Sequence, residues 1–254
     1  MLDATIRKWL TLAVCLGAVS ALASQEACRV QSGPTVTPVI ELYTSEGCSS
    51  CPPADRWLSK FRFPKADAGP VVVQAFHVGY WDYIGWIDRF ATPAHTVRQK
   101  QVASWNGANQ IYTPQAVLNG RDWQDWTRTT STASLAGRVI AHTAISLQQT
   151  GPDQFEATVS ADSLATVPWS AYWTVTEHGH SSRVKAGENA GELLQHDYVV
   201  RQYTPAGDYS TGANVPQKLQ LRSVAKTPGH ARQVNLVVFD KRTGVTLQAV
   251  SAGC

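Results

Sequence analysis

The segment that most constrains the fold covers residues 38–55, PVIELYTSEGCSSCPPAD. It begins with an apolar run, residues 39–43, whose composition is typical of a β-strand. A turn-rich step then leads to Cys48 and Cys51. Two prolines follow, and the first turn of a helix tolerates proline because its N–H groups have no partner within the helix. The segment therefore predicts a strand, a turn, a Cys-x-x-Cys pair and the start of a helix, in that order.

This placement gives the two thiols a predicted chemistry. The N-terminus of a helix stabilises a thiolate, and the thiolate is the form that attacks disulfides. We expect Cys48 to be the attacking thiol and Cys51 to be the buried resolving thiol. Glu41, on the preceding strand, either relays protons to Cys51 or faces water. We favour the second interpretation because buried acids are uncommon.

Residues 1–23 are predicted to be an export signal that is removed. Arg7 and Lys8 precede an apolar stretch, residues 9–20, that is too short to span a bilayer comfortably. Residues 21–23 have the small-x-small pattern of a cleavage site. An uncleaved membrane anchor is the alternative. After cleavage no stretch is apolar enough for a stable membrane span, so we expect a periplasmic or secreted protein.

Charge and cysteine content are compatible with export. A formal net charge of +3 over 254 residues gives no reason to expect nucleic acid as a partner. Once Cys48 and Cys51 are paired locally, Cys28 and Cys254 remain for a structural disulfide. Such a bridge closes nearly the whole mature chain and is worth roughly 5 kcal/mol in lost chain entropy. The alternative is a free or intermolecular thiol at the C-terminus.

The stretch after the cysteines predicts a second strand beside the first. Residues 57–63 continue as an amphipathic helix, and the apolar run 71–78 suits a central strand. The order strand, helix, strand favours a parallel pair. Open sheets bind their ligands at the carboxyl ends of such strands, so His77 is expected to contact substrate beside Cys48.

Residues 79–88 contain four aromatic residues between glycines and acids. They either plug into the core or form a wall of the substrate groove, where Tyr80 and Trp81 would contact substrate. Residues 93–104 then predict a helix with Val97 and Val102 on its inner side.

Residues 111–120, IYTPQAVLNG, combine Thr113-Pro114 with a short strand and Asn119-Gly120. Asn-Gly is a strong signal for a β-hairpin. Residues 125–139 predict a helix that closes the first domain.

The sequence changes character near residue 141. Short alternating runs occupy residues 144–151, 154–162, 171–179, 217–224, 233–240 and 245–252. Regular short strands of this kind predict a β-sandwich-like domain, residues 141–254, after an N-terminal segment, residues 24–35, and an α/β domain, residues 36–140.

Two polar stretches interrupt this pattern. Residues 187–197 either dock on the first domain or form a long surface turn, and we favour the turn because loops normally run over surfaces. His178 and His180 either ligate a metal or are solvated in a hairpin loop, and we favour solvation.

Four motifs together resemble an exported bacterial family, domain of unknown function 1223, of the thioredoxin-like superfamily: LYTSEGCSSCPPAD, AFHVGYWDYIGW, YTPQAVLNG and GENAGELLQHDYVV. The resemblance implies an α/β thioredoxin-like domain followed by an all-β sandwich-like domain. It also implies that Cys48 and Cys51 are the superfamily's redox pair and that Pro114 is its cis-proline. Thr113 would then offer its backbone to an extended substrate. Gly47 departs from thioredoxin itself, which has tryptophan before its first cysteine.

The leading hypothesis is an exported thiol–disulfide oxidoreductase that acts on protein or small-molecule thiols and disulfides, with an unknown electron partner. Thiol exchange needs no cofactor, and we expect no resident metal. The alternative is a binding module without turnover. It would either ligate a soft metal through Cys48 and Cys51, with His77 as a third ligand, or act as a disulfide-fixed scaffold.

Overall fold

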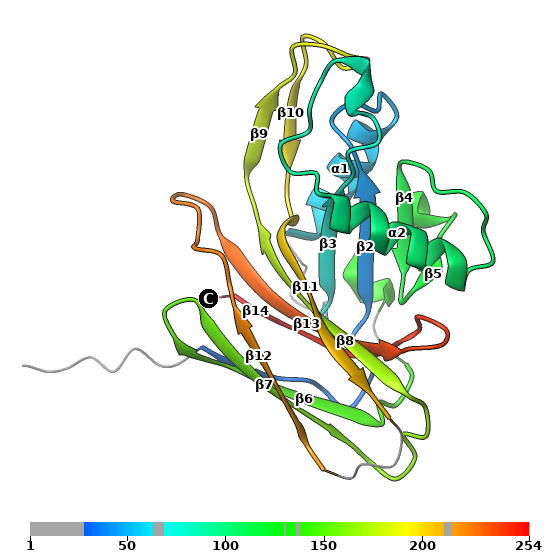
Figure 1. The fold of residues 1–254 in the computed structure, drawn as a ribbon, viewed down its shortest axis with the longest axis vertical. Helices are drawn as coiled ribbons and strands as arrows, with labels where there is room; N and C mark the ends of the chain where they lie inside the picture. Colours follow the sequence, from blue (N-terminus) through cyan, green and yellow to red (C-terminus); the bar gives the residue numbers. More distant parts are fainter. Residues whose placement is uncertain (1–27, 63–68, 130, 136–137, 211–214, 254) are drawn as a thin grey trace, which may run out of the picture.

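The computed structural model describes residues 28–62, 69–129, 131–135, 138–210 and 215–253 (Figure 1). The predicted signal peptide, residues 1–23, and Cys254 lie outside the described residues. The described chain is a mixed α/β fold, mostly β, with an eight-stranded mixed sheet, a four-stranded antiparallel sheet and a two-stranded hairpin. No helix in these ranges is long and apolar enough to cross a membrane.

The predicted strand-helix-strand unit is present. β2 (Val39–Thr44) and β3 (Val72–His77) pair in parallel, and every residue of both strands is buried. Between them lie α1 (Cys51–Ser59), which begins at the second cysteine, and the short 3-10 helix η1 (Lys60–Arg62).

The two main helices cover opposite faces of this strand pair. Successive residues of a strand point to opposite sides, so Ile40 and Leu42 pack with α1. Val39 and Tyr43 pack on the other side with α2 (Pro93–Trp105). The carboxyl ends of β2 and β3 therefore lie where α1 begins.

α2 buries a charge rather than the predicted apolar stripe. Val102 is buried as expected, but Val97 is 66% exposed. Arg98 points inward instead, with its Nη2 and Nε atoms 2.8 and 3.2 Å from the carboxylate oxygens of Glu41. The Tyr43 and Tyr172 hydroxyls donate to the same carboxylate.

Both interpretations of Glu41 are therefore wrong. Glu41 is 2% exposed, so it does not face water. It lies on the α2 side of β2 with Val39 and Tyr43, away from α1 and Cys51, so it has no place in a relay to that thiol.

The Asn-Gly hairpin is confirmed, and the helix after it is not. β4 (Gln115–Leu118) and β5 (Arg121–Asp122) are joined by Asn119 at φ 51° and Gly120 at φ 79°, as a two-residue turn of this hand requires. Residues 125–139 show only the 3-10 helices η3 (Trp126–Arg128) and η4 (Thr132–Leu135) in their described part. The hydroxyl-rich run 129–132 disfavours a longer helix because its side chains compete for backbone hydrogen bonds.

One long strand joins the two halves of the chain. β11 (Val199–Tyr209) pairs antiparallel with β8 (Trp169–Glu177) and in parallel with β3, where Val199 lies opposite Ala75. No strand is predicted for β11 from the sequence, because Pro205 and Gly207 are typical of turns. A register shift between Pro205 and Asp208 accommodates them.

The six strands predicted in the second half are all present. The four-stranded sheet contains β1 (Arg29–Gln31), β6 (Thr143–Gly151), β7 (Gln154–Ala161) and β12 (Gln217–Arg222). It packs against β8, β13 (Arg232–Asp240) and β14 (Thr246–Ala252) of the larger sheet through a core that includes Leu147, Phe155, Trp173 and Leu236 (Figure 1). The division at residue 140 stays a prediction, and the eight-stranded sheet crosses it.

Replacement of Arg98 tests the buried ion pair. We expect Arg98→Leu to lower the free energy of unfolding by about 3–5 kcal/mol, because it leaves the Glu41 carboxylate buried without a positive partner. Denaturant unfolding of the purified protein measures this. The exposed neighbour on the same helix provides the control, and Val97→Ala should change stability by no more than about 0.5 kcal/mol. Equal effects of the two substitutions would contradict the assignment.

Candidate functional site

The two cysteines lie where β2 turns into α1. The Cys48 N–H donates to the Ser45 carbonyl at 3.2 Å and the Cys51 N–H to the Cys48 carbonyl at 3.1 Å, so the loop tightens into the first helical turn. Both thiols are free. Cys48 is 1% exposed and Cys51 is fully buried, whereas Ser49 and Ser50 between them are exposed.

The Thr113-Pro114 segment lies directly beside this pair. Its peptide bond is cis, and the Thr113 carbonyl oxygen is 3.8 Å from Cys48 Sγ. The Ser50 hydroxyl is 3.2 Å from the same sulfur. The loop before β4 and the loop after β2 therefore meet at Cys48, although 65 positions separate Thr113 from Cys48 in the chain.

These neighbours shift the pKa values of the two thiols in opposite directions. A hydrogen bond from the Cys51 thiol is the largest influence on Cys48, and it lowers the pKa of Cys48 to about 6 despite burial. The Ser50 and Thr113 side chains and the Ser50 N–H act in the same direction. Burial, the hydrogen bond with Cys48 and the nearby charges of Cys48 and Asp55 all raise the pKa of Cys51. At neutral pH Cys48 is a thiolate and Cys51 a thiol.

The aromatic segment covers the pair. The Trp81 indole N–H donates to the Thr113 hydroxyl at 2.7 Å, which ties this segment to the loop beside Cys48. Gly47 packs so closely beneath it that an added Cβ would lie 3.0 Å from Trp81 Cβ. This packing accounts for glycine, and not a larger residue, in front of Cys48. Tyr80 is half-buried beside α2, whereas Tyr83 is 80% exposed. The segment therefore packs partly into the core, and its predicted contact with substrate through Tyr80 and Trp81 stays a prediction.

Residues 187–192 dock on the cysteine loop, so the surface-turn interpretation is wrong. They connect β9 (His180–Arg183) to β10 (Leu193–His196). The buried Asn189 amide donates to the Glu46 carbonyl at 2.9 Å and to the Cys48 carbonyl at 3.0 Å. The Glu188 carboxylate accepts the Ser49 N–H at 2.9 Å. The second half of the chain therefore fixes the backbone on both sides of Cys48.

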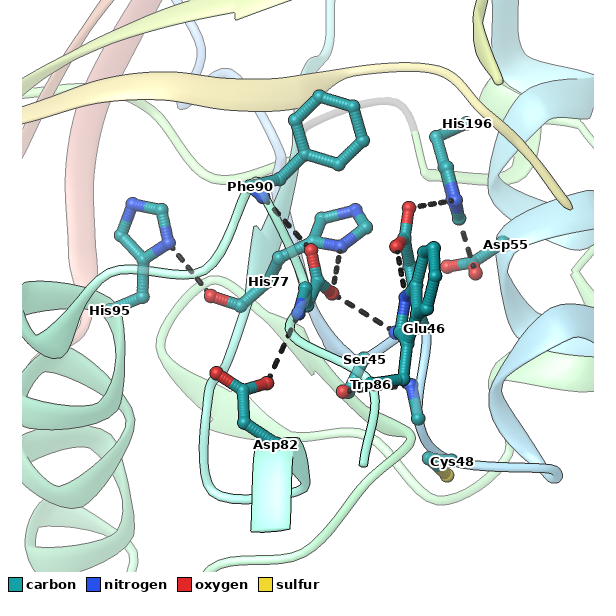
Figure 2. A network of polar contacts seen from close by, with 12 residues as sticks. Ser45, Glu46, Cys48, Asp55, His77, Asp82, Trp86, Phe90, His95 and His196 are labelled. Atoms are coloured by element: carbon teal, nitrogen blue, oxygen red, sulfur yellow. Dashed lines mark hydrogen bonds and ion pairs between the residues drawn. The ribbon is translucent and has the colours of Figure 1, made fainter. Parts of the chain in front are cut away.

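A buried network of carboxylate and histidine side chains lies behind the loop (Figure 2). The Asp88 carboxylate accepts the Glu46 N–H at 3.0 Å and lies 2.7 Å from His77 Nδ1. Burial opposes its ionisation, but the charge of and hydrogen bond with His77 lower the pKa of Asp88 to about 2. His77 itself is fully buried and supports the loop from behind through Asp88, and its predicted contact with substrate stays a prediction.

A second histidine lies between two carboxylates of the same network. His196 Nε2 is 3.3 Å from Glu46 and its Nδ1 is 3.5 Å from Asp55, while the Trp86 indole donates to Glu46 at 2.7 Å (Figure 2). Burial opposes protonation, but the hydrogen bonds with Asp55 and Glu46 raise the pKa of His196 to about 10. Because Asp55 also follows Cys51 by one helical turn, this network and the resolving thiol share one environment.

The remaining expectations have mixed outcomes. His178 and His180 are buried, with the carboxylates of Asp197 and Glu177 at 3.5 and 2.9 Å, so they are not solvated. The described residues contain no group of three or more His, Cys, Asp or Glu side chains arranged so that they could hold a metal ion. Cys28 is disulfide-bonded, and because Cys254 lies outside the described residues the pairing of these two stays a prediction.

Comparison with known proteins places this chain in a family. Residues 39–239 match the family described as "Protein of unknown function (DUF1223)". The chain belongs to the DUF1223 family. None of the curated proteins matches this DUF1223 chain.

Two solved structures are similar to the DUF1223 chain. Protein AGR_C_4864 from Agrobacterium tumefaciens is 26% identical with a TM-score of 0.65, and the match covers 87% of this chain and 96% of that one. HBP35 of Porphyromonas gingivalis is 12% identical with a TM-score of 0.60, over 87% of this chain and 76% of that one. At 12% identity the second likeness is one of fold alone.

The Trp81–Thr113 contact yields a test of access to the thiolate. Trp81→Phe removes the indole N–H donor but keeps an aromatic side chain. The covering segment should therefore separate more readily from the loop beside Cys48. A single hydrogen bond of this kind is worth about 0.5–1.5 kcal/mol, so the alkylation rate of Cys48 should rise up to about tenfold. Mass spectrometry after timed alkylation measures it. Tyr83→Phe, in the same segment but exposed, is the control, and an unchanged rate in Trp81→Phe would show that the indole does not restrict access.

Proposed function

We propose that this DUF1223 protein is an exported thiol–disulfide oxidoreductase of the thioredoxin-like class, with Cys48 as the attacking thiol and Cys51 as the resolving thiol. The observation that carries the proposal is the position of Cys48 Sγ. It lies at the start of α1, between the Ser50 hydroxyl at 3.2 Å and the Thr113 carbonyl at 3.8 Å. The β2-α1-β3 unit, α2 and the β4–β5 hairpin support the thioredoxin-like assignment.

The proposed reaction follows from the different pKa values of the two thiols. The Cys48 thiolate attacks one sulfur of a substrate disulfide, and the other substrate sulfur leaves as a thiolate and takes up a proton. The Cys51 thiol then loses its proton and attacks Cys48 Sγ. This step forms the Cys48–Cys51 disulfide and releases the second substrate thiol. The reverse sequence oxidises a dithiol substrate, and the electron partner determines the direction.

The residues beside the sulfur have distinct parts in this proposal. Thr113 and Pro114 would offer the Thr113 backbone to an extended substrate chain. Tyr80 and Trp81 would line the approach, once Trp81 has separated from Thr113. His77 is a positioning residue that acts through Asp88 on the Glu46 N–H. Export to the periplasm or outside the cell belongs to the proposal, since thiol exchange would there meet other exported proteins.

The first test is the pH dependence of alkylation. Cys48 has a pKa of about 6, so its alkylation rate should be half-maximal near pH 6 and fall roughly tenfold for each further unit of acid. Cys51→Ala removes the largest stabilising hydrogen bond, so the midpoint should move upward, toward the value of about 8.5 of an ordinary thiol. Rates measured from pH 4 to 9 on the reduced protein decide this. A midpoint near 8.5 in the unaltered protein would contradict the thiolate assignment.

The second test is capture of the substrate. In Cys51→Ala the mixed disulfide on Cys48 has no resolving thiol, so specific exported proteins or small thiols should accumulate on Cys48. Non-reducing gels and mass spectrometry of the periplasmic or secreted fraction identify them. Cys48→Ala, Cys51→Ala together is the matched control and should retain nothing. A reduction potential above about −250 mV for the pair would agree with exchange.

One observation favours a second candidate function. Cys48 is 1% exposed, as a disulfide-fixed scaffold with no turnover would allow. The scaffold hypothesis predicts that no adduct accumulates in Cys51→Ala. It also predicts that the Cys48–Cys51 disulfide, once formed, resists reduction by glutathione. The soft-metal version lacks support, because no group of three ligands occurs in the part of the chain that the structure describes.

A further inference from the structure

A polar cavity lies on the far side of Phe90 from the cysteine loop. Its volume is about 440 Å³, and its lining includes Arg89, Phe90, His180, Ser181, Arg201 and His230. These residues come from four separate segments: the stretch before α2, the start of β9, β11 and the loop before β13. Phe90 separates the cavity from the buried network, because its ring contacts His77 and His196 as well as His180.

The cavity has more positive than negative charge. Glu177 contacts three of the lining residues, and both of its carboxylate oxygens are engaged. One accepts the Thr227 N–H at 2.7 Å, and the other is 2.9 Å from His180 Nε2 and 3.4 Å from Arg201 Nε. Arg201 is therefore matched by Glu177. Among the described residues no carboxylate pairs with Arg89, whose guanidinium donates only to the Ser181 carbonyl, at 2.8 Å.

The donors are held in place before any ligand arrives. Both guanidinium groups lie over the Phe90 ring, with Arg89 Cζ at 4.5 Å and Arg201 Cζ at 5.3 Å from its centroid. His180 and His230 stack at 3.9 Å, and His230 Nδ1 is 2.7 Å from the His178 carbonyl oxygen. A guanidinium carries five N–H donors, and the Arg89 and Arg201 guanidinium groups each use few of theirs within the protein.

We propose that this cavity binds a small oxyanion, a carboxylate or phosphate group, between Arg89 and Arg201. Planar guanidinium groups recognise both groups through paired N–H bonds. An anion would balance the unmatched charge of Arg89 and accept from donors that have no protein acceptor. A cation is disfavoured by the two arginines. Burial is the main cause that lowers the pKa of His180 to about 4; the hydrogen bond with Glu177 and its charge oppose this, whereas His230 and Arg201 act in the same direction as burial. The site is separate from the thiols and does not depend on the proposed redox activity.

Titration with inorganic phosphate and with acetate tests this site. Isothermal calorimetry on the full chain at constant ionic strength, with chloride as the balancing anion, should show one-to-one binding of at least one of the two. Arg89→Gln should weaken it at least about tenfold, because it removes charge-assisted hydrogen bonds. Arg183→Gln removes an exposed arginine at the end of β9 that does not line the cavity, and it should leave the affinity unchanged. Histidine ring resonances of His180 and His230 should shift with the same dissociation constant.

Each outcome of these titrations either supports the anion site or overturns it. Tighter binding of phosphate than acetate, or the reverse, identifies the group that the cavity prefers, and either order supports the site. No heat and no histidine shift for both anions up to about 10 mM, ten times a millimolar dissociation constant, would overturn it. So would equal weakening by Arg89→Gln and Arg183→Gln, which would indicate general charge attraction. Arg89 is exposed, so its replacement should not impair folding; circular dichroism checks this.

Discussion

The pairing of β11 with β3 is the constraint on which the rest of this structure depends. It brings a strand from the second half of the chain against the strand that follows the cysteine helix, through Val199 and Ala75. The β9–β10 hairpin immediately precedes β11, so its position is fixed by the same pairing. That hairpin carries Asn189 to the backbone of the cysteine loop and His196 to Glu46 and Asp55. The thiol environment is thus assembled from both halves of the chain.

The buried carboxylates of this protein lie in direct contact with polar or basic partners. Glu41 and Arg98 are joined by two contacts and two tyrosine hydroxyls, and the network behind Cys48 alternates carboxylates with histidines. Removing one member would leave another charge buried and unpaired, which costs far more than an exposed pair contributes. Such networks therefore hold loops in one arrangement. Here the loop that they hold is the one that contains Cys48, and its backbone is tied to Asp88 through the Glu46 N–H.

Local patterns in the sequence were sufficient for the parts of the fold that local chemistry determines. The apolar runs of β2 and β3, the prolines at the start of α1 and the Asn119-Gly120 turn all specify their own structure. The sequence also placed Thr113-Pro114 beside Cys48, through a resemblance. The sequence did not predict the features that depend on contacts between residues far apart in the chain. Arg98 is buried only because Glu41 lies opposite it, and α2 therefore lacks an apolar stripe at Val97. Asn189 and His196 lie in a polar stretch that looks like a surface loop, and only the β11–β3 pairing brings them inside. Pro205 and Gly207 concealed β11 itself.

The shared sheet has a consequence for how this protein is divided. A fragment that ends near residue 140 would contain both cysteines and the Thr113-Pro114 loop. It would nevertheless lose β11, which pairs with β3 on the side away from β2, so the Ala75 N–H, which now donates to the Tyr198 carbonyl at 2.8 Å, would be left at an open edge. It would also lack the histidine between Glu46 and Asp55. The smallest piece that retains the native surroundings of the thiols therefore extends through β11. During synthesis those surroundings are incomplete until that strand has been made.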